Sequence, residues 1–304
     1  MQQVQLDNEK KVLRQLKQVY SRASQDCAEK IRELNSRTDM QNLQSIIYQK
    51  QYQEALKKQL DGICDTLQNN QFTSIADYLG TSYEDGFIGT LFDLQGQGIP
   101  LIFPIDESQV VKALQTDTKL KSSLYKSLGE DVDYLKKSIK AELSRGIANG
   151  SSWLDIAAHI ANGMNSPFDK ALNRSSLIAR TEGHRIQNQA ALDCQHKAKD
   201  KGADVLKQWD STLDKRTRKA HVEADGQIVE LDEYFSVGGE EMEAPGVGGT
   251  AKNVCNCRCC LLQRARWALS DVEYTKMNGD TNELVKLEES DYTKFKHKAK
   301  DIMN

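Results

Sequence analysis

The sequence predicts an α+β protein. We expect a long N-terminal helical hairpin or bundle, then a helix-rich region, and last a small C-terminal α+β domain with a β-hairpin. Three observations predict this class. Apolar residues recur at helical spacing over most of residues 4–200, the pattern changes to strand spacing after Gly202, and Asp225-Gly226 is a strong turn signal inside that last part.

Length and composition restrict the class of protein further. The 304 residues suffice for two or three domains, and 38% apolar with 28% charged residues indicate helical surface beside a modest core. There is no run of eighteen apolar residues, and the N-terminus lacks the apolar stretch of a signal peptide. The sequence therefore predicts a chain without a membrane anchor that is made and used in a cytoplasm.

The net charge restricts the possible partners, and the cysteine usage agrees with a cytoplasmic location. The net charge of −3 gives no overall attraction to nucleic acid, so any such binding must be local. Cys27, Cys64 and Cys194 stand alone, and four more cysteines crowd into "CNCRCC" at 255–260. This uneven set favours a reducing compartment over a disulfide framework.

Residues 1–70 predict a helical hairpin. One apolar stripe runs from Leu13 to Leu34, and a second runs from Leu43 to Leu67 after a polar break whose candidate N-caps are Thr38 and Asp39. Two such helices can pack antiparallel. The pattern leaves open whether the pair is an interaction arm or simply a buried core.

Residues 71–129 predict a mixed connector region. Aromatic residues and glycines occur together, which indicates a short helix that ends near Gly96 or Gly98. An extended "IPLIFP" segment should follow, and the helical pattern returns from Glu107.

Residues 130–268 predict the main domain, beginning with helices. A stripe from Val132 to Ile147 ends at Gly150, Ser151 or Ser152 caps the next helix, and a further helix runs from Pro167 to Gly202. One side of that last helix carries polar side chains: Arg180, Glu182, His184, Arg185, and Gln187 or Asn188. By itself this pattern indicates a solvated, salt-bridged face.

After Gly202 the sequence predicts strands and a polar cluster. "DVLKQWD" is a strand with Val205 and Trp209, and Asp225-Gly226 predicts a type I′ hairpin. If the residues between them form a helix, Asp214, Thr217, Arg218 and His221 share one face. The alternative is an isolated Asp214–Arg218 ion pair on an exposed helix.

The cysteine cluster follows a flexible, glycine-rich stretch, and it lies at the start of a further strand. Cys257 and Cys259 fall on the same side of an extended chain, so with His221 and Asp214 they could form a tetrahedral zinc site. Because side chains of an extended chain alternate between its two sides, Cys255 should lie on the same side as Cys257 and Cys259, and Cys260 on the opposite side. The alternative is that these cysteines are small buried apolar residues.

Charge is distributed unevenly along the same region. Residues 207–221 hold five basic and two acidic side chains, whereas residues 223–243 hold eight acidic and no basic ones. The acidic segment must be solvated or face a basic partner. Lys215, Arg216 and Lys219 are candidates for contacts with phosphates of double-stranded DNA, without preference for sequence.

The order of these motifs resembles one family. "RTE", "WDSTLDKRTR", a histidine, "DGQ", "LDE" before "FSVGG", a Pro-Gly and "NCRC" occur in the order found in the phage Mu F-like minor head proteins, over Glu130 to Leu262. Two departures are Val247, where the family often has an acidic residue, and the additional Cys255 and Cys260. The family pattern falls on Arg180, Thr181, Glu182, Trp209, Asp214, Arg216, Thr217, Arg218, His221, Asp225, Gly226, Phe235, Pro245, Cys257, Arg258 and Cys259.

The resemblance implies a virion protein present in few copies inside the head, near the portal vertex, and in the host cytoplasm during assembly. Its implied roles are head assembly and genome packaging or ejection. Its implied partners are the portal protein and capsid or scaffold proteins. The resulting interpretation is a structural protein and not an enzyme, with zinc as the single cofactor that the residues suggest.

Two other functions stay open at this point. A metal-dependent nuclease or nucleotidyl-group transferase would use His221 as acid or base, Asp214 as its orienting group and Arg218 as a clamp. The family's domain also occurs as a carrier in front of toxin domains. Here only residues 263–304 follow the motif, and residues 269–304 read as a basic tail.

Overall fold

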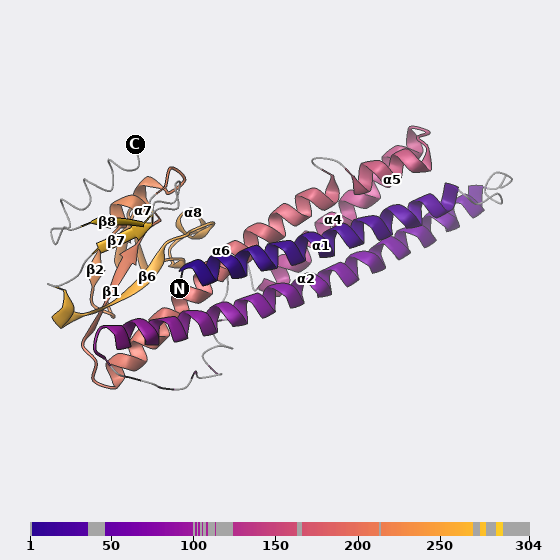
Figure 1. Ribbon diagram of the computed structural model, residues 1–304. Coiled ribbons are helices and arrows are strands. Elements are labelled where there is room, and N and C mark those ends of the chain that lie inside the picture. Colours follow the sequence, from indigo (N-terminus) through magenta and orange to yellow (C-terminus); the bar gives the residue numbers. More distant parts are fainter. Residues whose placement is uncertain are drawn as a thin grey trace. The chain divides into compact units, whose positions relative to one another are not determined.

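The computed structural model describes residues 2–35, 46–99, 124–162, 166–212 and 214–269, single positions between 101 and 113, and two late strands (Figure 1). The predicted caps Thr38 and Asp39, most of the segment after Pro100 and the end of the basic tail lie outside these residues. The helices are α1 Gln2–Asn35, α2 Ile46–Gly96, α4 Leu124–Ala148, α5 Trp153–Ala161, α6 Pro167–Asp200, α7 Lys219–Ala224 and α8 Ala251–Val254.

The strands form three small antiparallel sheets, which confirms the α+β class. The first sheet has the order β2-β1-β6, the second β3-β4-β5 and the third β7-β8. The strands are β1 Val205–Asp210, β2 Ile228–Val229, β3 Phe235–Val237, β4 Glu240–Ala244, β5 Val247–Gly248, β6 Cys260–Ala265, β7 Tyr274–Met277 and β8 Leu284–Leu287.

The chain divides into two compact units. One consists of residues 7–78 and 121–179 and is called the helical unit here. The other consists of residues 1–6, 79–120 and 180–304 and is called the mixed unit. Within the part of the chain that the structure describes, no helix is both long enough and apolar enough to cross a membrane.

The helical unit is built around the two predicted stripes. Tyr20, Cys27 and Ile31 of α1 are buried, as are Leu56, Leu60 and Leu67 of α2, and they share one core with the apolar face of α4. The helices therefore bury their stripes against one another, as amphipathic helices do. Two boundaries of α4 and α5 are confirmed: Gly150 has a φ of +67° after the end of α4, and the Ser152 hydroxyl accepts a hydrogen bond from Asp155 N.

The expected short helix after residue 71 is not a separate element. α2 continues from Ile46 without interruption and ends at Gly96, the predicted end. Glycine was the misleading signal, because a glycine can also allow close helix packing. At Gly86 an added Cβ would lie 2.8 Å from the carbonyl oxygen of Gln187 in α6.

The mixed unit places β1 in the middle of its first sheet. β1 pairs with β6 over six residue pairs, from Val205–Ala265 to Asp210–Cys260, and with β2 on its other edge. Trp209 of β1 is fully buried in the core of this unit, where its ring packs edge-to-face on Phe235 of β3. The predicted strand from Val205 and its anchoring tryptophan are confirmed.

The hairpin turn lies at a different place from the predicted one. Asp225-Gly226 joins α7 to β2, and Gln227 N donates to Ala224 O across it. Asp225 has φ −55° and ψ 129° and Gly226 has φ +79°, which are values of a type II turn and not of type I′. The two positive φ values of a type I′ hairpin occur at Gly238 and Gly239, between β3 and β4.

The glycine-rich stretch expected to be flexible is instead ordered as the sheet β3-β4-β5. Phe235, Val237, Met242 and Ala244 alternate inward and are fully buried. The glycines supply turn conformations between these strands, which is why the local composition resembles that of a loop.

Candidate functional site

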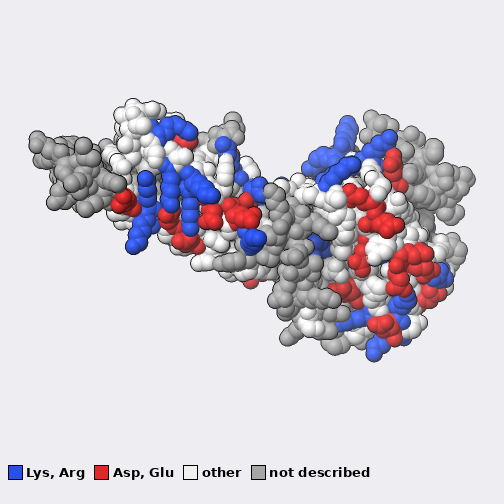
Figure 2. Space-filling view, turned by 180° about the vertical axis from the view of Figure 1, so that it is seen from behind, with Lys and Arg blue, Asp and Glu red and all other residues white. Residues whose placement is uncertain are grey.

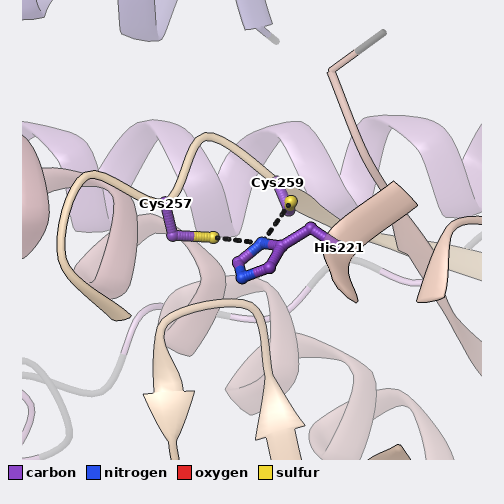
Figure 3. A group of neighbouring side chains, drawn as sticks. All are labelled: His221, Cys257 and Cys259. Atoms are coloured by element: carbon purple, nitrogen blue, oxygen red, sulfur yellow. Dashed lines mark hydrogen bonds between the residues drawn. The ribbon is translucent and has the colours of Figure 1, made fainter. Parts of the chain in front are cut away.

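His221, Cys257 and Cys259 form the candidate site of the mixed unit (Figure 3). Their ligand atoms all lie within 4.8 Å of one another, and all three residues are buried, at 2–3% exposure. The ring nitrogen Nδ1 of His221 lies 3.3 Å from Cys259 Sγ and 3.7 Å from Cys257 Sγ. The structure thus brings together three of the four predicted zinc ligands.

α7 positions the imidazole. This helix begins at Lys219, so His221 lies in its first turn, and the ring packs edge-to-face on Trp209 at 5.6 Å between centroids. The hydroxyl of Ser211 donates to the carbonyl oxygen of His221 at 2.7 Å and accepts from the Trp209 indole at 3.0 Å. Among the described residues Nε2 of His221 has no hydrogen-bond partner, so Nδ1 is the nitrogen that engages the thiols.

The loop between α8 and β6 positions the two thiols. Asn256 has a φ of +54°, a left-handed conformation that asparagine tolerates better than most residues, and its N–H donates to the hydroxyl of Thr181 in α6. The chain then extends, so Cys257 and Cys259 point inward while Arg258 points to the other side. The predicted alternation is confirmed for this pair. Cys255 and Cys260 are half-buried and do not join the group.

The two thiols influence each other's ionisation. A hydrogen bond from Cys259 lowers the pKa of the Cys257 thiol, although burial acts in the opposite direction. The same interaction, together with burial, raises the pKa of Cys259 well above its usual value. The hydrogen bond between the two thiols therefore favours ionisation of Cys257 over ionisation of Cys259.

Asp214 is the centre of a second, separate cluster. Its carboxylate is fully buried and forms a two-pronged ion pair with Arg258, in which Nη2 lies 2.6 Å from Oδ1. The backbone N–H of Arg216 donates to Oδ1 at 3.0 Å, and the hydroxyl of Thr217 lies 3.0 Å from the same oxygen. The hydrogen bonds from Arg258 hold the pKa of Asp214 well below its usual range.

The structure differs from the sequence-based expectations for Asp214 in three respects. Residues 214–218 form a turn and not a helix, because the aspartate side chain binds the backbone two residues ahead and competes with helical hydrogen bonds. Asp214 pairs with Arg258 and Arg216 instead of Arg218, whose guanidinium donates to the carbonyl of Cys255. Its carboxylate also lies outside the group of potential ligands that His221, Cys257 and Cys259 form.

The polar side of α6 is buried and not solvated, contrary to the prediction. Glu182 and Arg185 are 1% and 5% exposed and form an ion pair of 2.6 Å, although burial raises the pKa of Glu182. Arg180 is exposed. The solvated interpretation failed because a helix that is packed on several sides must bury polar groups, which then need partners within the protein.

Asn188 is the residue whose importance the sequence did not reveal. Its amide donates to the carbonyl oxygens of Pro245 at 2.8 Å and Cys259 at 3.0 Å, and it accepts from Leu261 N at 2.9 Å. It therefore joins α6 to the β4–β5 turn and to the start of β6. Only its place on the same helix side as Glu182 and Arg185 could have signalled this role.

Asp225 and the predicted DNA contacts have different surroundings. Asp225 is buried, and its carboxylate accepts a hydrogen bond from Ser211 N at 2.7 Å, which ties the loop after β1 to the turn after α7. Lys215, Arg216 and Lys219 are all exposed. In Figure 2 the lobe that carries the strands shows basic side chains gathered at one end, acidic ones below them, and acidic and basic ones interspersed at the opposite end.

Comparison with known proteins gives a family and two relatives. Residues 137–262 match the family described as phage Mu protein F like protein. The chain is 28% identical over 236 residues to minor head protein GP7 of Bacillus phage SPP1. The aligned residues are 76% of this chain and 75% of that protein. No solved structure matches significantly.

The second relative is a longer protein with an enzyme name. The chain is 30% identical over 191 residues to the NAD(+)–arginine ADP-ribosyltransferase EFV of Enterococcus faecalis. These residues are 62% of this chain but only 38% of that protein. Residues 137–262 therefore match the phage Mu protein F like family, and over three quarters of its length the chain is similar to a phage minor head protein.

Proposed function

We propose that this protein is a minor head component that associates with the portal vertex and takes part in head assembly and in packaging or ejection of the genome. The observation that carries the proposal is the alignment with the SPP1 minor head protein, which extends over three quarters of both chains. It therefore includes helical segments outside residues 137–262 as well as the family domain.

The two units suit different parts of this role. The mixed unit is held by buried polar contacts, such as those of Asn188 and Asp214, which fix one arrangement of its loops. The helical unit offers long helices with exposed charged faces, among them Lys11, Arg14 and Lys17 of α1. We propose that the helical unit docks on portal or capsid proteins.

Co-purification tests the portal association. The full chain, produced together with the portal protein of the same phage, should elute with it in size-exclusion chromatography. Variants with reversed charge on exposed positions of α1 should weaken the complex, whereas reversal at Lys215 and Lys219 should not. Two proteins that elute separately at micromolar concentration would contradict the proposal.

We further propose that Lys215, Arg216 and Lys219 contact phosphates of double-stranded DNA. These side chains are exposed and lie in or beside the turn that Asp214 stabilises, so the cluster gives their backbone a fixed geometry. Phosphate contacts of this kind carry no sequence preference and depend steeply on salt.

A salt titration tests the DNA contact. The logarithm of the binding constant falls linearly with the logarithm of the salt concentration. Each lost phosphate contact should make this negative slope shallower by about 0.9, so the slope of the triple alanine variant should be shallower by roughly 2 to 3. The matched control replaces Lys11, Arg14 and Lys17, which are equally basic and exposed on α1. Absence of binding at low salt, or equal losses in both variants, would remove the DNA contact and leave portal docking untouched.

The described geometry does not support the catalytic alternative. It requires Asp214, Arg218 and His221 on one face, but each engages a different partner: Arg258, the Cys255 carbonyl and the thiol pair. The proposal therefore assigns these residues no catalytic step. Nuclease and nucleotidyl-transfer assays with added metals should give the same background for the wild type and His221→Ala, and metal-dependent turnover lost in the variant would restore the alternative.

A further inference from the structure

Three donor atoms from two distant segments point at one common position in the mixed unit. His221 comes from α7, and Cys257 and Cys259 come from the loop before β6, 36 and 38 residues further along the chain. Figure 3 shows both sulfur atoms facing the same ring nitrogen. One nitrogen can form a good hydrogen bond with one thiol, so its placement between two thiols needs a further reason.

The distances fit a tetrahedral metal ion. With Zn–S of about 2.3 Å and Zn–N of about 2.05 Å, ligands at the tetrahedral angle are separated by about 3.6 Å between nitrogen and sulfur. The two observed separations are 3.3 and 3.7 Å. An ion could therefore occupy the common position with little movement of the side chains.

The chemistry of the donors selects the kind of metal. Thiolate and imidazole are ligands for zinc and other soft or borderline ions, whereas magnesium and calcium require oxygen. Two thiolates also neutralise a divalent ion, which matters because all three residues are almost completely buried.

We propose that His221 Nδ1, Cys257 Sγ and Cys259 Sγ bind one zinc ion, which joins α7 to the start of β6 and stabilises the mixed unit. No other His, Cys, Asp or Glu of the described residues belongs to the group, so these three side chains are the ligands that the described residues supply. Ser211, whose Oγ lies 3.5 Å from Cys259 Sγ, lines the site and positions His221 through its carbonyl. The site is structural and does not depend on the function proposed above.

Metal analysis of the full chain is the direct test. Protein purified without chelators under reducing conditions should contain about one zinc per chain after gel filtration. Cys257→Ser, Cys259→Ser and His221→Ala should each lose most of this zinc. Cys255→Ser is the matched control, because this thiol lies in the same loop outside the group, and it should keep the metal.

Two further measurements separate loss of metal from loss of folding. Cobalt substitution of the wild-type chain should give thiolate-to-cobalt charge-transfer bands and the visible bands of tetrahedral cobalt. His221→Cys, which replaces one soft ligand by another, should recover zinc binding that His221→Ala loses. Both measurements use chains whose helical content is first verified by circular dichroism.

Three outcomes would overturn the proposal. One is wild-type protein that binds neither zinc nor cobalt when refolded with either ion. Another is zinc that is retained by Cys257→Ser and Cys259→Ser, since the ion would then lie elsewhere. The third is a metal-free chain in which thiol titration of the unfolded protein finds two cysteines missing, which would indicate a disulfide between Cys257 and Cys259.

Discussion

Asp214 shows how one buried charge organises a surface. Its carboxylate binds the guanidinium of Arg258, 44 residues away, and also the backbone of the turn that carries Arg216. A buried carboxylate is costly unless it is paired and hydrogen-bonded, and here each oxygen has several partners. The turn can therefore present basic side chains outward while its own negative charge stays fixed inside.

Asp214→Asn should lower the free energy of unfolding by about 3 kcal/mol at neutral pH, because Arg258 loses its charged partner. The folded state holds the pKa of Asp214 below its unfolded value of about 3.9, so this stabilisation is present above pH of about 4 and is lost as the pH falls further. Urea unfolding of the wild type and of Asp214→Asn at several pH values measures this difference in the free energy of unfolding. Asp232→Asn, in an exposed pair with Lys199, is the control and should change little.

The amide of Asn188 should be equally sensitive. Asn188→Ala leaves two buried carbonyls and one buried N–H without their partner, which should lower the free energy of unfolding by about 3 kcal/mol. The neighbouring Gln189→Ala loses only a half-buried contact with Asp193 and should cost less than about 1 kcal/mol. Similar effects of both changes in urea unfolding would contradict the role of Asn188 as a bridge.

At the scale of elements, the packing of α2 on α6 depends on small residues. Gly86 faces the backbone of Gln187 and the methyl group of Ala190, so the two helices approach closely at this point. Near the end of α2, Asp93 accepts a hydrogen bond from the side chain of Gln263 in β6. Gln97, directly after the helix, accepts from Ala265 N and donates to Gln263 O. The side chain of Gln97 thus pairs with this edge strand as a neighbouring strand would, which protects the edge.

Gly86→Ala should destabilise the mixed unit by roughly 1 to 3 kcal/mol, because the added methyl group would lie 2.8 Å from a backbone oxygen and neither helix can yield easily. Gly80→Ala in the same helix meets no atom within 4 Å, so it should stabilise the chain by about 0.5 to 1 kcal/mol through higher helix propensity. Thermal unfolding of the two variants compares them. Equal shifts would show that the close approach at Gly86 does not matter.

At the scale of the whole molecule, each unit has its own means of stabilisation. The helical unit buries a long apolar core, whereas the mixed unit combines a smaller core with buried ion pairs, bridging amides and the thiol–imidazole group. A metal that is bound in the folded state contributes directly to the stability of the unit that holds it.

Chelation should therefore affect the two units differently. In hydrogen exchange after removal of the proposed zinc ion, amides of β1, β6 and α7 should exchange at least roughly tenfold faster, while those of α1 and α4 keep their protection. Cys255→Ser should behave as the wild type. A uniform loss of protection in both units, or none in either, would contradict separate stabilisation.

Local sequence patterns sufficed for most of the elements. The stripes of α1, α2 and α4, the cap at Ser152, the strand at Val205–Asp210 and the order of the family motifs are all contained in short stretches of chain. Helical and strand periodicity depend on neighbouring residues, so such features can be recognised before any tertiary contact is known. The meeting of His221 with Cys257 and Cys259 was also predicted, from the strand spacing of the two cysteines and the ligand chemistry of the three side chains.

Only the tertiary structure decided which partner each polar group has. Asp214 had a nearby arginine at 218, yet it pairs with Arg258, and the polar side of α6 is buried instead of solvated. The turn at Asp225 and the sheet formed by the glycine-rich stretch depend likewise on what packs against them. Burial and pairing are set by residues far apart in the chain, and their energies exceed the small local preferences that a sequence pattern reports.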